Sequence, residues 1–210
     1  MGKIMMDQST INKLNEKYKN ASPIEIIKKA FELNNKAVVT TNFRPYEAAI
    51  LYAVSLVESK IPVVWCDTGY NTPQTYKHAE KVIKELDLNV FLYVPKQTSA
   101  HRDVVMGIPS IDATEHALFT EQVKLEPFKR AMDEHKPKVW FTNLRHGQTA
   151  FRNSIGIFSM SKDGVLKVSP FYYWSDEKLD TFLEENKLPN EFKYFDPTKA
   201  LENRECGLHA

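Results

Sequence analysis

The chain has 210 residues, enough for one α/β domain of ordinary size, and its 42% hydrophobic and 26% charged residues are typical of a globular protein. A formal net charge of +1 provides no broad basic field, so we expect no nucleic-acid partner. No apolar run approaches the ~20 residues of a membrane span, and the N-terminus has no signal-peptide core, so we expect a cytoplasmic protein without membrane contact.

The first half of the chain alternates predicted helices with short apolar strands. A capping box formed by Ser22 and Glu25, with proline at the first helical position, predicts a helix to about Leu33. The segments that follow are a strand at 37–40, a helix from 45, a strand at 62–66, a helix at 72–86 and a strand at 90–94. This alternation predicts βαβ units and a mainly parallel sheet flanked by helices.

The second half is less regular. The expected elements are an irregular or partly helical stretch at 96–120, a helix at 127–135, a strand at 139–141, a hairpin at 154–169 turning at Asp163-Gly164, and a helix capped by Ser175. The final residues are polar and show no period. We therefore expect one domain over 1–187, followed by a mobile C-terminal tail over 188–210.

Two loops lie where such a sheet would bind a ligand. Ligands of parallel α/β sheets sit beyond the carboxyl ends of the strands. Those positions correspond here to Thr40–Pro45 and Asp67–Tyr70. Hydroxyl and backbone N–H groups at a helix N-terminus suit a phosphate or sulfate, although a plain capped helix would show the same residues.

Three cationic residues form a candidate anion site. Arg145 and Arg152 follow the predicted strand at 139–141, and Lys124 stands just ahead of the helix at 127–135. Guanidinium groups match the oxygen geometry of phosphate and sulfate. The alternative is that all three are solvated surface charges, because the sequence does not show that they converge.

Two cysteines, Cys66 and Cys206, are too few for the four thiolates of a typical iron–sulfur cluster or structural zinc site, so we expect no such metal centre. Cys66 closes an apolar strand, which favours a small core residue over a second thiol at the site. Cys206 lies in a polar stretch, where Arg204 and His209 would lower its pKa and Glu205 would raise it. Composition alone leaves a functional thiol and an incidental surface thiol equally open.

The sequence Glu205-Cys206-Gly207-Leu208-His209 resembles the terminal motif that holds the catalytic cysteine of thioredoxin-dependent phosphoadenylyl-sulfate (PAPS) reductases. Other segments resemble motifs of this family in the same order, over roughly residues 36–209. They are Thr40-Thr41-Asn42-Phe43, Asp67-Thr68-Gly69-Tyr70, Lys124-Leu125-Glu126-Pro127, and Leu144-Arg145 with Gln148 and Arg152. Five motifs in a matching order argue against coincidence.

The resemblance implies an adenine nucleotide α-hydrolase-like fold and a homodimer without a bound cofactor. It implies reduction of PAPS to sulfite and adenosine 3′,5′-bisphosphate in sulfate assimilation, on the way to cysteine biosynthesis. Cys206 would take up the sulfuryl group as S-sulfocysteine, and thioredoxin (or glutaredoxin) would release sulfite. The implied substrate-binding residues are Thr40, Thr41, Phe43, Asp67, Thr68, Gly69, Tyr70, Lys124, Arg145, Gln148, Arg152, Arg204 and His209.

The chain departs from the family pattern at three places. Arg44 stands where the family usually has glycine, and His146 stands where it has a second arginine. The segment before the terminal motif is shorter than usual and lacks a Gly-Asp-x-His-Thr-Thr stretch. These departures bear on backbone freedom in the first loop, on docking of the tail and on recognition of the 3′-phosphate.

Three alternatives remain open at the level of sequence. The nearest is a cluster-free reductase of adenylyl sulfate (APS), which lacks the 3′-phosphate. An ATP pyrophosphatase-type thiolation enzyme is less favoured, because the loop at 40–45 lacks the Ser-Gly-Gly-x-Asp-Ser sequence of that class. A nucleotide-binding or thioredoxin-binding module without activity is the third, and the retained Cys206 argues against it.

Overall fold

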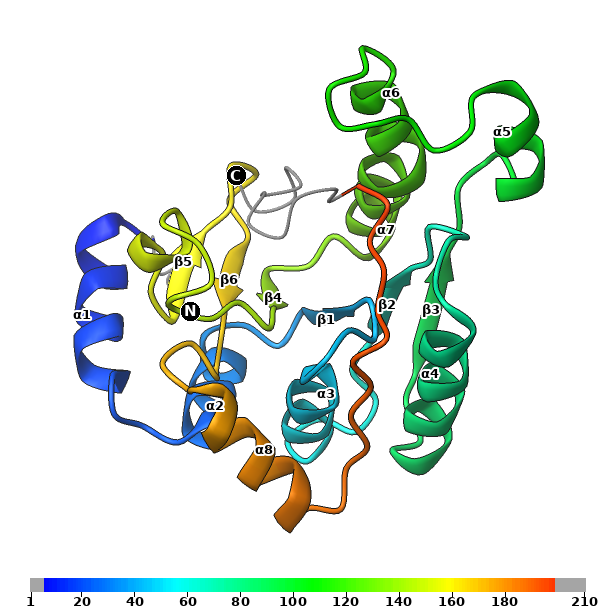
Figure 1. Cartoon of the computed structure of the whole chain (residues 1–210). Helices are drawn as coiled ribbons and strands as arrows, with labels where there is room; N and C mark the ends of the chain where they lie inside the picture. Colours follow the sequence, from blue (N-terminus) through cyan, green and yellow to red (C-terminus); the bar gives the residue numbers. More distant parts are fainter. Residues whose placement is uncertain (1–5, 199–210) are drawn as a thin grey trace.

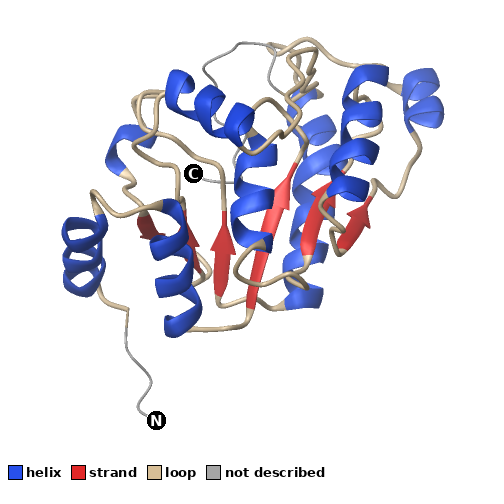
Figure 2. Cartoon of the chain, turned by 90° about the horizontal axis from the view of Figure 1, so that it is seen from below, coloured by secondary structure: helices blue, strands red, loops and turns tan. Residues whose placement is uncertain are grey.

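The computed structural model describes residues 6–198, which form a six-stranded sheet flanked by helices (Figures 1 and 2). The strands are β1 (Ala37–Thr41), β2 (Val63–Cys66), β3 (Val90–Tyr93), β4 (Val139–Phe141), β5 (Phe158–Met160) and β6 (Leu166–Val168). Their order is β3-β2-β1-β4-β6-β5, with β5 antiparallel to β6 and the other neighbours parallel. The predicted mainly parallel α/β sheet is confirmed.

From α2 onward, the helices also follow the predicted order. They are α1 (Gln8–Tyr18), α2 (Pro23–Leu33), α3 (Glu47–Ser55), α4 (Pro73–Glu85), α5 (Ser99–Val105), α6 (His116–Thr120), α7 (Glu126–His135) and α8 (Asp176–Glu185), with a π-helical turn η1 (Glu121–Leu125) and a 3-10 turn η2 (Arg152–Ser154). The capping box before α2 is present, because Ser22 Oγ accepts from Glu25 N and the Glu25 carboxylate accepts from Ser22 N.

Alternating side chains of the strands build two separate cores. Val39 and Phe141 face the larger core, whereas Val38, Val64 and Trp140 face a smaller one that includes Ala131 of α7. This division follows from the two-residue period of a strand, which sends neighbouring side chains to opposite faces. Because both faces are covered, the strands are apolar on both sides and appear in the sequence as continuous apolar runs.

Helix α1 was not predicted from the sequence. Its composition is polar, and Ile11 is its one buried residue. Asn15 connects it to the sheet edge, since its Oδ1 accepts from Phe158 N (2.8 Å) and its Nδ2 donates to Phe158 O (2.9 Å). Gly156, with φ +82°, approaches so closely that a Cβ there would lie 2.7 Å from Asn15 Nδ2. The polar contacts of Asn15 thus add to the packing of Ile11, Leu14 and Tyr18 on the main core, and hydrophobic periodicity does not detect such polar contacts.

Residues 188–198, called here the C-terminal segment, run from α8 past α3 and α4 to η1 (Figure 1, orange to red). Asn190 Oδ1 accepts from Tyr46 N (2.8 Å), just ahead of α3. Lys193 O accepts from Thr72 Oγ1 (2.6 Å) and Thr75 Oγ1 (3.2 Å) at the start of α4. The segment is thus fixed to helices that begin where β1 and β2 end.

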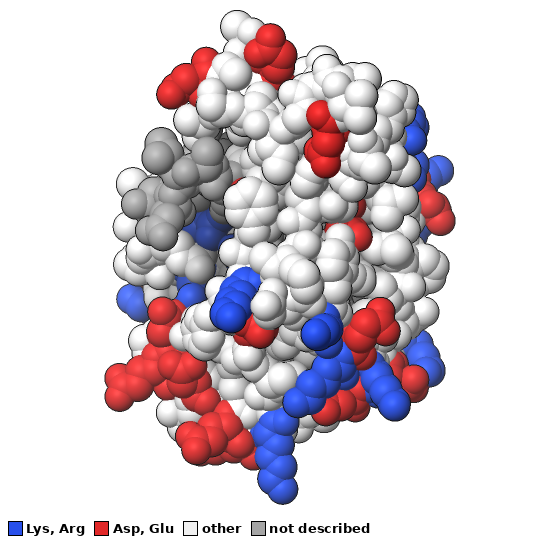
Figure 3. Space-filling model, turned by 45° about the vertical axis from the view of Figure 1, so that its right-hand side comes forward, with Lys and Arg blue, Asp and Glu red and all other residues white. Residues whose placement is uncertain are grey.

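No helix among residues 6–198 is long and apolar enough to cross a membrane. On the face drawn in Figure 3, lysine and arginine side chains lie among aspartate and glutamate side chains, and a broad area is uncharged. Charges of both signs are therefore mixed on this face.

Candidate active site

A cavity of about 350 Å³ lies at the carboxyl ends of β1 and β4. Both parallel strands deliver their following loops to this edge of the sheet, where ligands of such folds bind. Hydroxyl, amide, cationic and aromatic side chains contribute to its wall. The lining residues are Thr40, Thr41, Asn42, Arg44, Pro45, Glu47, Val64, Cys66, Lys124, Phe128, Trp140, Asn143, Leu144, Arg152, Tyr194, Phe195 and Asp196.

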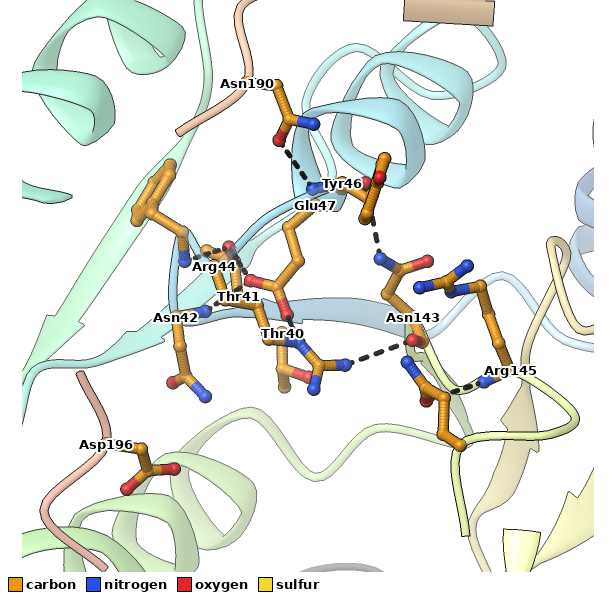
Figure 4. A network of polar contacts seen from close by, with 12 residues as sticks. Thr40, Thr41, Asn42, Arg44, Tyr46, Glu47, Asn143, Arg145, Asn190 and Asp196 are labelled. Atoms are coloured by element: carbon orange, nitrogen blue, oxygen red, sulfur yellow. Dashed lines mark hydrogen bonds and ion pairs between the residues drawn. The ribbon is translucent and has the colours of Figure 1, made fainter. Parts of the chain in front are cut away.

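Glu47 organises the loop between β1 and α3 (Figure 4). Its buried carboxylate accepts from Thr41 Oγ1 (2.8 Å), Asn42 N (2.7 Å) and Arg44 Nε (2.8 Å). Arg44 Nη2 also donates to Asn143 O (3.1 Å), which connects this loop to the one after β4. A buried carboxylate with three charge-assisted partners fixes the loop that lines the cavity.

The positive φ angles of this loop fall on Phe43 (52°) and Tyr46 (69°), and not on Arg44. Phe43 is buried against Trp65, with ring centroids 4.8 Å apart. It therefore packs the loop against the core and does not line the cavity. Arg44 therefore replaces the family's usual glycine at a position that needs no left-handed backbone. Its side chain instead brings a guanidinium group to the cavity wall.

Of the predicted cations, Lys124 and Arg152 line the cavity and Arg145 does not. Arg152 Nη1 donates to Gln148 Oε1 (2.5 Å), and the same oxygen accepts from Arg145 N (3.1 Å), so Gln148 orients the Arg152 side chain. The Arg145 guanidinium pairs with Asp176 at the start of α8 and lies 5.1 Å from the centre of the Tyr46 ring.

Lys124 is almost completely buried, with 4% of its side chain exposed. Its Nζ donates to Asp196 Oδ2 (2.5 Å) and to Thr198 Oγ1 (3.2 Å), both in the C-terminal segment. Burial alone would raise the pKa of Asp196, but the Lys124 charge, together with hydrogen bonds from Lys124 and Thr198, lowers it overall. Asp196 is therefore ionised at neutral pH, and its ion pair with Lys124 joins the C-terminal segment to η1.

The loop after β2 is held by Asp67. Its carboxylate accepts from Gly69 N (2.9 Å), Asn71 Nδ2 (2.9 Å) and Tyr76 Oη (3.0 Å). Thr68 lines a small pocket that adjoins the main cavity, whereas Tyr70 turns outward, its hydroxyl donating to Asp103 (2.8 Å). Within this motif, Asp67 and Gly69 shape the loop, and Thr68 comes nearest to the cavity.

Cys66 ends β2 at the cavity and is buried. Burial raises the pKa of its thiol to about 12, although Lys124 and Arg130 act in the opposite direction. A thiol that stays protonated at neutral pH is a poor nucleophile. These properties fit the small core residue favoured from the sequence.

The predicted nucleophile Cys206 and its neighbours Arg204 and His209 lie outside the described residues. Within residues 6–198 there is no cluster of three or more histidine, cysteine, aspartate or glutamate side chains placed to hold a metal ion.

Sequence reasoning missed several residues of the cavity. Glu47 and Asn143 hold loops, and Asp196 pairs with Lys124. The sequence did contain a signal for Glu47. It is an acidic residue three positions after the cation Arg44, at the start of a predicted helix, and side chains at this spacing can form an ion pair. For Asp196 there was none, since its partner lies 72 positions away.

A cavity lined by hydroxyls, amides and cations at the carboxyl edge of a parallel sheet defines an α/β domain suited to anionic ligands such as nucleotides. The family model "Phosphoadenosine phosphosulfate reductase domain" matches residues 36–195, and the chain belongs to this family.

Curated relatives carry the same name. Phosphoadenosine 5′-phosphosulfate reductase of Aliivibrio salmonicida is 31% identical, and the match covers 75% of this chain but only 62% of that protein. The reductase of Vibrio atlanticus is 28% identical over 95% of this chain and 86% of its own length.

Solved structures show the same fold. The phosphoadenylyl-sulfate reductase of Candida auris, solved as a phosphate complex, superposes with a TM-score of 0.78 at 24% identity, covering 90% of this chain and 91% of that one. Candida glabrata FMN adenylyltransferase in complex with ATP superposes with a TM-score of 0.57 at 15% identity, covering 89% of this chain and 60% of that one. The expected adenine nucleotide α-hydrolase-like fold is confirmed.

Proposed function

We propose that the chain reduces PAPS to sulfite and adenosine 3′,5′-bisphosphate. The observation that carries this proposal is the family match over residues 36–195, which spans every part of the described cavity wall except Asp196. The cavity wall includes Arg152 and Arg44, the latter paired with Glu47, and a nucleotide with several negative charges needs such guanidinium partners.

In the proposed first step, the Cys206 thiolate attacks the sulfur of the sulfuryl group. A bond forms between Cys206 Sγ and that sulfur, the sulfur–oxygen bond to the nucleotide phosphate breaks, and adenosine 3′,5′-bisphosphate leaves with the electron pair. Arg152 offsets the repulsion between the thiolate and the anionic substrate, and Arg44, whose charge Glu47 balances, adds N–H donors. Gln148 keeps Arg152 in place for this role.

In the proposed second step, a thiolate of reduced thioredoxin attacks Cys206 Sγ and sulfite leaves. The mixed disulfide is then resolved by the second thioredoxin thiol, which returns Cys206 as a thiolate and leaves thioredoxin oxidised. The two electrons that reduce the sulfur thus come from the external dithiol, and glutaredoxin is the alternative donor. No bound cofactor takes part in this scheme.

Mass spectrometry of the protein incubated with PAPS tests the first step directly. We expect a sulfonate adduct on Cys206, and we expect Cys206→Ser to abolish sulfite release while nucleotide binding survives. Turnover by the serine variant would contradict the mechanism. Cys66→Ser is the matched control, and we expect it to form the adduct, because the raised pKa of the buried Cys66 thiol makes it a poor nucleophile.

APS reduction is the alternative that the sequence left open. The names of the relatives favour PAPS. Sulfite release from PAPS and APS, each with thioredoxin and with glutaredoxin, separates the two substrates and the two reductants. Equal or better turnover of APS would overturn the choice of PAPS, and release of pyrophosphate from ATP would instead support an ATP pyrophosphatase-type enzyme.

A homodimer in the cytoplasm completes the proposal, and it rests on the family resemblance. Light scattering coupled to gel filtration gives the mass in solution, for which we expect twice the 24.2 kDa of the chain. A monomer would contradict this part and leave the proposed chemistry unaffected.

A further inference from the structure

A second cavity lies between α7 and the hairpin turn that joins β5 to β6. Its volume is about 540 Å³, against about 350 Å³ for the cavity at the carboxyl ends of β1 and β4. We propose that this second cavity binds a small organic anion, one that combines an apolar or aromatic body with a carboxylate, phosphate or sulfonate group. Binding there does not depend on the proposed function, because the ligand occupies a site separate from the candidate active site.

The cavity forms where α7 leaves part of one sheet face uncovered. Helix α7 contributes Phe128, Ala131 and Met132 to the smaller core and packs over β2 and β3. The same face of β4 and β6 extends beyond the helix. Trp140 of β4 and Lys167 of β6 are neighbours in register, point to this face and line the cavity.

The part of the wall nearest the sheet is apolar and aromatic. Phe128 and Trp140 pack with ring centroids 4.9 Å apart, and both line this cavity as well as the candidate active site. The two rings therefore form a wall between the cavities, so both cavities can be occupied at once. Leu125, Met132 and Val165 extend the apolar surface. Small-molecule pockets are mostly apolar and enclose roughly 300–1,000 Å³, a range that includes this cavity.

The rim of the cavity carries a net positive charge. Five lysines line it, against three carboxylates. One of these lysines, Lys129, already pairs with Asp133 (2.7 Å). The other two carboxylates, those of Glu121 and Asp163, are exposed, so the solvent screens their repulsion of an anion. An anionic group is therefore attracted to this rim.

Three of the lysines are available to a ligand. Lys136 follows α7, Lys138 precedes β4 and Lys162 lies in the hairpin turn, so they reach the cavity from three segments. All three are exposed, and within residues 6–198 their side chains form no ion pair or hydrogen bond. An anion can bind to them without breaking a contact of the protein. Cations of one sign around an apolar cavity also strengthen the field that a ligand meets there.

Anilinonaphthalene sulfonate (ANS) is a probe with this chemistry, because it joins aromatic rings to a sulfonate. Phenylnaphthylamine is its uncharged counterpart. Fluorescence titration of the full chain with each probe compares the unchanged protein with a rim variant, Lys138→Glu/Lys162→Glu, and with Met132→Trp, which fills the apolar part of the cavity. The matched control is Lys77→Glu/Lys84→Glu, which makes the same change in net charge at exposed positions of α4, a helix that packs on the larger core.

We expect the unchanged chain to bind ANS saturably. The rim variant should weaken this binding at least about tenfold, because two attractive charges become repulsive, and should change the Kd of phenylnaphthylamine less than about twofold. Met132→Trp should weaken the binding of both probes, and the control variant should leave both Kd values within about twofold. Saturating adenosine 3′,5′-bisphosphate should also leave the Kd of ANS within about twofold, because the wall of Phe128 and Trp140 separates the two cavities.

Any of four results would overturn the proposal. They are the absence of saturable ANS binding, equal weakening by the rim and control variants, equal weakening of both probes by the rim variant, and displacement of ANS by adenosine 3′,5′-bisphosphate. The last result would place the probe in the candidate active site. Urea denaturation shows whether Met132→Trp folds, and the rim variant decides if it does not. If adenosine 3′,5′-bisphosphate fails to bind, the proposed function fails, and the rim and control variants still decide on the second cavity.

Discussion

At the scale of single residues, the binding loop depends most on Glu47. Its buried carboxylate accepts from Thr41, Asn42 and Arg44. We expect Glu47→Gln to lower the free energy of unfolding by about 2–4 kcal/mol, because the amide accepts fewer bonds and leaves Arg44 without its counter-ion.

Urea denaturation measures the loss for Glu47→Gln, and titration with adenosine 3′,5′-bisphosphate measures the effect on the cavity, where we expect weaker binding. Glu80→Gln, on the exposed face of α4, is the control and should change the free energy of unfolding by less than about 0.5 kcal/mol. Equal stabilities of the two variants would show that the Glu47 network does not hold the loop.

The buried thiol of Cys66 leads to a prediction about the stability of the fold at alkaline pH. Burial raises its pKa from 9.0 to about 12, so the folded protein keeps a proton that the unfolded chain releases. Its contribution to stability is complete below pH 9 and is lost as the pH rises from about 9 to about 12. In this window the free energy of unfolding should decrease by up to roughly 1.4 kcal/mol per pH unit for this one thiol.

The Cys66 contribution is isolated by comparison with Cys66→Ala. Urea denaturation of both proteins at several pH values should show a steeper alkaline decrease for the unchanged chain, because the tyrosines with raised pKa, such as Tyr76, are common to both. Parallel pH profiles would mean that the thiol titrates normally in the folded state.

At the scale of elements, the sequence predicted the sheet, because its strands are apolar runs of standard length separated by capped helices. The hairpin turned where expected, with Gly164 at φ +74° between β5 and β6. The position of the loops at 40–45 and 67–70 beside the cavity followed from the predicted topology alone, because the loops after parallel strands lie at the same edge of the sheet. Contacts between distant polar residues, such as Asn15 with Phe158, have no periodic signal and were missed.

The connection between α1 and β5 can be tested through that contact. Asn15→Ala removes a donor and an acceptor from Phe158 at once, so we expect the free energy of unfolding to decrease by about 1–3 kcal/mol. Asn12→Ala, on the exposed side of the same helix, should change it by less than about 0.5 kcal/mol. Thermal or urea denaturation separates the two, and equal effects would mean that α1 is held by its apolar face instead.

At the scale of the whole molecule, the question is where the folded domain ends and the C-terminal residues begin. A boundary after residue 187 followed from the change to a polar composition without a period. The structure shows that residues 190–196 contact α3, α4 and η1 through Asn190, Lys193 and Asp196. These contacts use backbone carbonyls and polar side chains, which composition cannot distinguish from a solvated stretch.

Two shortened chains separate the roles of the C-terminal segment and of the residues after it. A chain that ends after Thr198 keeps the described sheet, both cores and the cavity wall, so we expect it to fold and to lose adduct formation together with Cys206. A chain that ends after Lys187 also loses the partner of Lys124. Because a buried ammonium without its carboxylate costs about 3–5 kcal/mol, we expect this second chain to be strongly destabilised.

Urea denaturation and nucleotide titration of the two shortened chains give the comparison. If both were equally stable, residues 188–198 would be an independent tail, and the Lys124–Asp196 pair would not matter for folding. If only the longer chain is stable, the folded domain extends at least through Thr198, because the buried Lys124 needs the Asp196 carboxylate that residues 188–198 supply.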